Sequence, residues 1–141
     1  MFKHLLIVVI VLNFSISLVN AKEVTYPSDL WKGIIGEAVS EGYNGMYAVT
    51  CVYRNRLIRG KSLGCIALVR KDLTPFVKRQ GKRYEQMAKD IIIKVFILGT
   101  PDVTKGATHY ENIEQFGIPW WAKDMEITCK IGQHTFYKKK V

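Results

Sequence analysis

The first apolar repeat after the N-terminal segment has the period of an α-helix. Its members lie three or four positions apart: Trp31, Ile34, Ile35 and Ala38. We expect Ser28 to be the N-cap of this helix, with Asp29 near the positive end of the helix dipole. Glu37 lies about 60° around the axis from Ile34, and Glu41 follows one turn later. Both carboxylates are therefore expected at the edge of the core, where a cleft can form.

A second helix is expected to follow, delimited by glycines. Residues 42–45 read Gly-Tyr-Asn-Gly and predict a break, after which the helical period runs from Met46 to Leu57 and stops at Gly60. The two helices are predicted to form a hairpin. Residues 59–83 are basic, contain Gly and Pro and have no sustained period, which predicts mostly loop and one wall of a cleft.

The clearest helical repeat of the chain covers residues 84–96 and ends at Gly99-Thr100-Pro101. The segments 107–113, 126–131 and 135–139 are short, partly alternating and rich in Thr, Tyr, Phe and Ile. Such segments predict short strands or extended chain. The pattern as a whole predicts a small α+β domain, mainly helical, with a few short strands toward the C-terminus.

The N-terminal segment has the layout of a secretory signal peptide. Lys3 precedes an almost wholly apolar run at 5–19, and Val19-Asn20-Ala21 offers small residues to a signal peptidase. The run is shorter than the roughly 20 apolar residues that span a bilayer. Residues 1–21 are therefore predicted to be a cleaved signal, and residues 22–141 one domain exported to the periplasm or extracellular cell envelope, with membrane contact only during export.

The charge balance predicts an anionic partner. The chain has 21 Lys and Arg against 12 Asp and Glu, a formal net charge of +9. The positive electrostatic field of such a chain attracts anions but does not select one kind of anion. Because an exported protein meets lipid phosphates, teichoic acids or the carboxylates of peptidoglycan, we expect one of these partners rather than nucleic acid, and we expect a monomer.

The positions of the cysteines and histidines limit the kinds of reactive or metal-binding site that we expect. Cys51 falls within an apolar helical pattern and is expected to be buried and unreactive. Three pairings of the cysteines are possible in an oxidising compartment. The expected burial of Cys51 favours a disulfide between Cys65 and Cys129. The histidines show no metal-ligand spacing, so neither a metal nor another cofactor is expected.

Glu37 is the main candidate for a catalytic residue. A glycoside bond breaks when an acid protonates the leaving oxygen, and an apolar, partly desolvated setting keeps such an acid protonated near neutral pH. A glutamate at a helix edge is also commonly solvated or salt-bridged. The sequence leaves open whether water or the sugar's own 6-hydroxyl attacks, and which residue would be a second carboxylate: Glu41, Glu111, Glu114 or Asp124.

Two separated segments resemble the SleB-type cell-wall hydrolases. Residues 35–49, with Val52 and Asn55-Arg56, are similar to the pattern E-A-x-x-E followed by G, A-V, V and N-R. Near the C-terminus, the resemblance rests on Gly106-Ala107-Thr108-His109-Tyr110, Pro119-Trp120-Trp121-Ala122 and residues 131–137. With the helix between them, these segments cover nearly all of residues 31–138.

The resemblance implies a lysozyme-like fold shared with lytic transglycosylases, acting between N-acetylmuramic acid and N-acetylglucosamine. Glu37, the first Glu of the motif, is implied as the catalytic acid. The implied substrate-binding residues are Glu41, Asn55, His109, Tyr110 and Trp120; Glu41 is also expected to have a supporting role and Asn55 to anchor a helix. One residue of the Trp120-Trp121 pair is expected to stack on sugar and the other to pack in the core. The alternative is a non-catalytic wall-binding or inhibitory module on the same fold.

Overall fold

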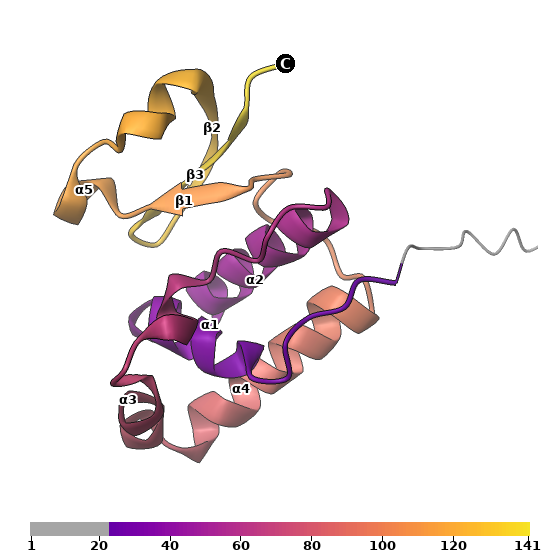
Figure 1. Cartoon of the computed structure of the whole chain (residues 1–141), viewed down its shortest axis with the longest axis vertical. Coiled ribbons are helices and arrows are strands. Elements are labelled where there is room, and N and C mark those ends of the chain that lie inside the picture. The colour runs from indigo at the N-terminus through magenta and orange to yellow at the C-terminus, as the bar shows by residue number, and fades with distance from the viewer. Residues whose placement is uncertain (1–22) are drawn as a thin grey trace, which may run out of the picture.

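The computed structural model describes residues 23–141, and the predicted signal peptide, residues 1–21, lies outside the described residues. Within them, four α-helices form the body of the molecule (Figure 1): α1 (Leu30–Ala38), α2 (Gly42–Ile58), α3 (Leu73–Gln80) and α4 (Lys82–Ile92). Short 3₁₀ or π-helical segments connect or extend them: η1 (Val39–Glu41), η2 (Ile66–Val69) and η3 (Ile93–Ile97). The helix predicted at residues 84–96 is confirmed as α4 with its extension η3.

A small antiparallel sheet forms the second part of the molecule and lies beside α2 (Figure 1). Its strands are β1 (His109–Glu111), β2 (Met125–Ile131) and β3 (His134–Lys139), in the order β1-β3-β2. Two short helical segments, α5 (Ile113–Phe116) and η4 (Trp120–Asp124), lie between β1 and β2 in the chain. The predicted α+β fold with short C-terminal strands is therefore confirmed.

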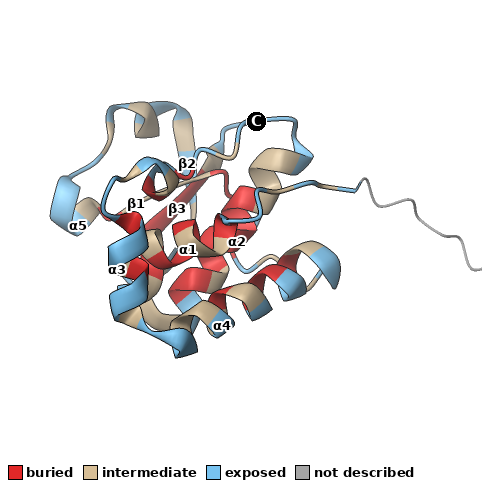
Figure 2. Ribbon diagram, turned by 60° about the horizontal axis from the view of Figure 1, so that its bottom comes forward, coloured by how far each residue is buried: buried red, intermediate tan, exposed pale blue. Residues whose placement is uncertain are grey.

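The core lies around α1, which packs against α2, α3, α4 and η2 (Figure 2). The predicted helical face of α1 is confirmed, because Ile34 and Ile35 are fully buried. Each such side chain stabilises the fold by about 1.5–3 kcal/mol relative to an exposed one. A second apolar cluster joins α2 to the sheet through Val52 and Phe136. The second cluster thus holds the sheet against the helical body, and these two parts form the walls of one cleft.

The ends of the first two helices differ from the prediction. The N-cap of α1 is Asp29 rather than Ser28, because the turn in which the Leu30 amide donates to the Pro27 carbonyl precedes the helix. The break between the helices lies at η1 (Val39–Glu41), and α2 begins at Gly42. Gly45 is inside α2, where a Cβ atom would lie 2.4 Å from Cβ of Glu41. Gly45 therefore allows a close side-chain approach rather than a break.

The basic segment 59–83 is not mostly loop, since it contains η2 and the whole of α3. Leu73 and Val77 are buried on one face of α3. Pro75 occupies the third position of that helix, in the first turn, where a missing amide N–H breaks no helical hydrogen bond. The prediction failed because eight residues contain too few turns to show a period, while the proline suggested a loop.

The predicted Cys65–Cys129 disulfide is wrong, because all three cysteines are free. Cys65 is buried under α1, where its Sγ lies 2.5 Å from the position of a Cβ on Gly33, whereas Cys129 lies on β2 and its thiol donates to the Val103 carbonyl. Cys51 is buried as expected, and burial raises the pKa of its thiol to about 12. Among the described residues, no helix has the length and apolarity needed to cross a membrane.

Candidate active site

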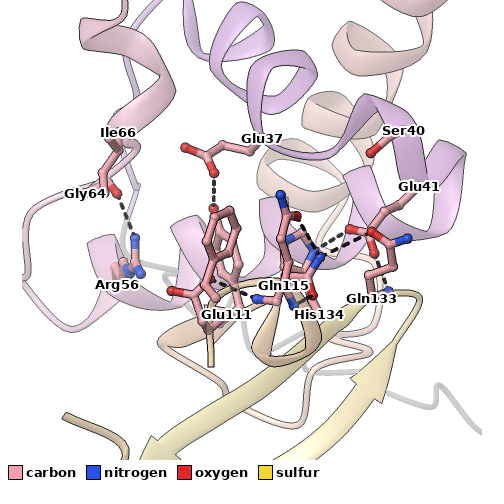
Figure 3. A pocket seen from close by; sticks show the side chains of 13 residues that line it. Glu37, Ser40, Glu41, Arg56, Gly64, Ile66, Glu111, Gln115, Gln133 and His134 are labelled. Carbon is pink, nitrogen blue, oxygen red and sulfur yellow. Dashed lines mark hydrogen bonds and ion pairs between the residues drawn. The ribbon is translucent and has the colours of Figure 1, made fainter. Parts of the chain in front are cut away.

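A cleft of about 330 Å³ lies between the helical body and the sheet. Figure 3 shows Arg56 and Gly64 at one end of it, Glu41 and His134 at the other, and Glu37 between them. The lining side chains come from α1 and η1, from α2, from the segment that leads into η2, and from β1, α5 and the β2–β3 turn. The cleft thus assembles segments that are far apart in the sequence.

Glu37 lies in the last turn of α1, half-buried, and its carboxylate is held from two sides. The Ala67 amide at the start of η2 donates to Oε1 at 2.8 Å. The Tyr110 hydroxyl on β1 donates to Oε2 at 3.2 Å (Figure 3). Because these donors belong to a helical segment and to the sheet, the two walls of the cleft both determine where the carboxylate lies.

Tyr110 belongs to a short chain of buried hydroxyls. Its oxygen lies 2.6 Å from that of Tyr53 on α2. Since the Tyr110 hydrogen is directed to Glu37, Tyr53 donates to Tyr110. Burial raises the pKa of both tyrosines well above the ordinary value. Both hydroxyls therefore keep their protons at neutral pH and remain donors.

Arg56 on α2 holds the segment at its own end of the cleft in place through hydrogen bonds. Its Nε donates to the Thr108 carbonyl at 2.6 Å, and its Nη1 donates to the Leu63 and Gly64 carbonyls at 2.9 and 3.2 Å. The guanidinium carbon also lies 5.9 Å from the centre of the Tyr110 ring. Arg56 thereby ties α2 to β1 and to the chain that leads into η2.

Glu41 supports the opposite end of the cleft. Its side chain is only 5% exposed and forms an ion pair with Nδ1 of His134 on β3. Its Oε1 accepts a hydrogen bond from the Gln133 amide in the β2–β3 turn. A Cβ atom on Gly132 would lie 2.5 Å from Oε1, so the turn approaches the carboxylate as closely as only glycine permits. Glu41 lines the cleft, as expected of a binding residue, but its Oε1 accepts from the Gln133 amide and its Oε2 lies against Nδ1 of His134.

Three of the predicted substrate contacts do not line this cleft. Asn55 donates to Asp102 at 2.8 Å and to the Ala107 carbonyl at 2.9 Å, so its amide anchors α2 to the chain before β1. His109 lines a second hollow, next to Arg56 and Gly64, rather than this cleft. The expected contact of His109 with a sugar at Glu37 is therefore not supported.

The two adjacent tryptophans lie outside the cleft as well. Trp120 is 83% exposed beside Ile118, in a shallow apolar hollow of the segment between β1 and β2. Trp121 packs against His109 and Tyr137, with ring centres 5.0 and 5.2 Å apart. One ring thus packs and one is exposed, but the exposed ring is not placed to stack on a sugar bound at Glu37.

Among the candidates for a second carboxylate, the structure brings Glu111 and Glu41 to the cleft with Glu37. Glu114 forms an ion pair with Lys130, and Asp124 lies in η4 away from the cleft. Glu111 on β1 accepts a hydrogen bond from the Asn112 amide at 2.9 Å through Oε1. Because the Glu41 side chain is only 5% exposed, Glu111 is the second carboxylate best placed to act on a ligand.

Several cleft residues were not singled out from the sequence: Ser40, Tyr53, Arg56, Gln115, Gln133 and His134. The glycine at 132 between two alternating segments was the one available signal for the turn that carries Gln133 and His134. Within residues 23–141, no group of three or more His, Cys, Asp or Glu side chains is arranged to hold a metal ion.

The fold and the cleft define a small α+β domain with a carboxylate-lined groove. A family model of cell wall hydrolases matches residues 40–137, and the chain belongs to this cell wall hydrolase family. The matched region contains Glu41, Tyr110 and His134, and it begins three residues after Glu37. No curated protein and no solved structure matches the chain. Family membership indicates a hydrolytic enzyme that acts on peptidoglycan at the cell envelope.

Proposed function

We propose that this cell wall hydrolase cleaves peptidoglycan glycan strands between N-acetylmuramic acid and N-acetylglucosamine, with Glu37 as the catalytic acid. The observation that carries the proposal is the position of Glu37. Its carboxyl group lies in the middle of a cleft, held by one donor from each wall. A catalytic carboxyl must be positioned in this way to transfer its proton in a defined direction.

In the proposed reaction, the Glu37 carboxyl donates its proton to the glycosidic oxygen as the bond to the anomeric carbon breaks. The Ala67 amide and the Tyr110 hydroxyl then stabilise the resulting carboxylate, because hydrogen bonds to a charged acceptor are stronger than those to a neutral one. The same carboxylate can accept the proton of the 6-hydroxyl as that oxygen attacks the anomeric carbon. A single residue then suffices for a lytic transglycosylase, which leaves a 1,6-anhydro end.

Attack by water is the second possibility, and the presence of Glu111 in the same cleft favours it. In an inverting hydrolase, a second carboxylate activates water on the opposite face of the sugar ring. Glu111 follows Tyr110 on β1, the strand whose Tyr110 hydroxyl donates to Glu37. This route leaves a reducing end and requires both Glu37 and Glu111.

Digestion of purified sacculi by the chain without residues 1–21, followed by mass spectrometry of the soluble products, tests the proposal. We expect muropeptides that end in 1,6-anhydromuramic acid, and none from Glu37→Gln. Glu126→Gln is a matched control, because Glu126 is an exposed glutamate of β2 paired with Lys138. Reducing ends that disappear in Glu111→Gln would establish hydrolysis instead. Binding to sacculi without any released glycan would favour the non-catalytic module.

A further inference from the structure

A second hollow adjoins the cleft at Arg56 and Gly64. It has a volume of about 290 Å³ and is lined by Arg56, Lys61, Ser62, Gly64 and His109. Arg56 and Gly64 line both spaces, and they lie at one end of the cleft in Figure 3. The second hollow is therefore the immediate neighbour of the cleft on the Arg56 side.

The second hollow is positively charged. Two cationic side chains line it, from Arg56 and Lys61, and no carboxylate does. Lys61 is exposed and forms no ion pair with any residue of the described chain. The guanidinium of Arg56 uses Nε and Nη1 for carbonyl groups, and no hydrogen bond within residues 23–141 engages its Nη2. Both cations therefore have bonding capacity for an anion.

The imidazole of His109 also lines this hollow. The pKa of its imidazole is lowered first by burial and then by the charges of Arg56 and Lys61. Its ring is fixed by packing on Trp121 and by the hydrogen bond between Nδ1 and the Thr108 hydroxyl at 2.9 Å. The wall opposite the two cations is thus a rigid, neutral ring at neutral pH. The net charge of the hollow comes from Arg56 and Lys61 alone.

We propose that the second hollow binds a carboxylate of the stem peptide carried by the muramic acid next to the scissile bond. The inference rests on the proposed function, since it takes the strand to lie across Glu37. The sugar rings of peptidoglycan are uncharged, and its carboxylates belong to the stem peptide, or to the lactyl group where no peptide is attached. The two cations of this hollow, with no carboxylate among its lining residues, therefore suit a peptide carboxylate better than an uncharged sugar ring.

Binding measurements can test this subsite without relying on turnover. The protein is the Glu37→Gln chain, and the probes are a soluble disaccharide tetrapeptide, the same compound with its carboxylates converted to methylamides, and the peptide-free disaccharide with a free lactyl carboxylate. Affinity is measured by isothermal titration calorimetry at two salt concentrations. We expect the tetrapeptide with free carboxylates to bind most tightly, and high salt to reduce its advantage.

Substitution of Lys61 identifies the site. Lys61→Glu should weaken binding of the free tetrapeptide by about fivefold to tenfold, since it replaces an exposed attraction with a repulsion. It should leave the methylamide probe unaffected. Lys61→Gln should have a smaller effect in the same direction. Because it introduces no new charge, it separates the loss of the lysine from a folding defect in Lys61→Glu. Lys78→Glu on α3 is the matched control, because it makes the same change of charge at an exposed lysine that does not line either space.

Three outcomes would overturn the inference. Equal affinities for the free and methylamide tetrapeptides would exclude a carboxylate subsite. An equal loss in Lys61→Glu and Lys78→Glu would indicate general charge attraction. Tight, Lys61-dependent binding of the peptide-free disaccharide would assign the subsite to the lactyl carboxylate rather than to the peptide. If sacculi yield no cleaved glycan while Lys61-dependent binding persists, the proposed reaction fails and the subsite stands.

Discussion

Glu37 and Glu41 lie four residues apart and line the same cleft, yet their surroundings differ. Glu37 lies between an amide and a hydroxyl, with its carboxylate accessible from the cleft. Glu41 is 5% exposed and joined to His134 and to the β2–β3 turn. The same side chain thus provides a candidate acid at one position and a support at the other. Its surroundings in the fold, rather than its chemistry, separate the two roles.

The difference arises because α1 ends at Ala38. A continuous helix would place both carboxylates nearly in line on one face. Instead, Ala38 departs from helical geometry at φ −142°, and η1 turns the chain before α2 begins. Glu41 is thereby directed toward the β2–β3 turn, while Glu37 keeps its direction from α1. The following variants test this contrast, in order of decreasing expected effect.

Glu37→Gln should abolish most of the activity and leave the fold intact. General acid–base catalysis contributes about 10²- to 10⁴-fold, so release of muropeptides from sacculi should fall by a factor in that range. The melting temperature should change little, because glutamine preserves the shape of a half-buried side chain. A large fall in melting temperature would show that Glu37, like Glu41, is a structural residue.

Glu41→Ala should chiefly reduce stability. The substitution leaves both the Gln133 amide and Nδ1 of His134 without their partner, and each unsatisfied buried group costs about 1–3 kcal/mol, so we expect about 2–4 kcal/mol. Urea unfolding followed by circular dichroism measures the change. Glu126→Ala removes an exposed partner of Lys138 and should cost less than about 1 kcal/mol. Equal losses in the two variants would contradict the supporting role of Glu41.

Gly132→Ala should destabilise the protein by about 1–2 kcal/mol, because φ at this position is +58° and the new methyl group meets Oε1 of Glu41. The steric part of this loss should disappear when Glu41→Ala is also present. A double-mutant cycle measured by urea unfolding gives the coupling. Strictly additive losses would show that the turn does not rest on Glu41.

Tyr110→Phe should have the smallest effect of the four. It removes one donor from Glu37 and leaves the buried Tyr53 hydroxyl without its acceptor. We expect a roughly tenfold fall in activity and a loss of about 1 kcal/mol in stability. Tyr137→Phe is the control, since Tyr137 is buried near the sheet away from Glu37. If both variants retain full activity, the tyrosine does not position the carboxylate.

The sequence predicted the helices with several clear turns, the short strands and the importance of Glu37, because these follow from local periodicity and from a local motif. The sequence predicted side-chain positions less well where these depend on contacts between distant segments. Asn55 and His109 belong to segments that resemble the family, but neither lines the cleft: Asn55 donates to Asp102, and His109 lines the adjoining hollow. Cys65 and Cys129 were paired by elimination, whereas the fold separates them between the helical core and β2.

By itself, the sequence determined the α+β class, the buried face of α1 and the cell wall hydrolase family, because side-chain period and motif order are properties of the chain. Only the tertiary structure decided which groups surround each carboxylate. The Ala67 amide, the Tyr110 hydroxyl and His134 lie 30, 73 and 93 positions away from Glu37 or Glu41. Packing of η2 on α1 brings the Ala67 amide to the cleft, and packing of the sheet against α2 brings the other two. Hydrogen bonds and ion pairs require contact in space regardless of separation along the chain.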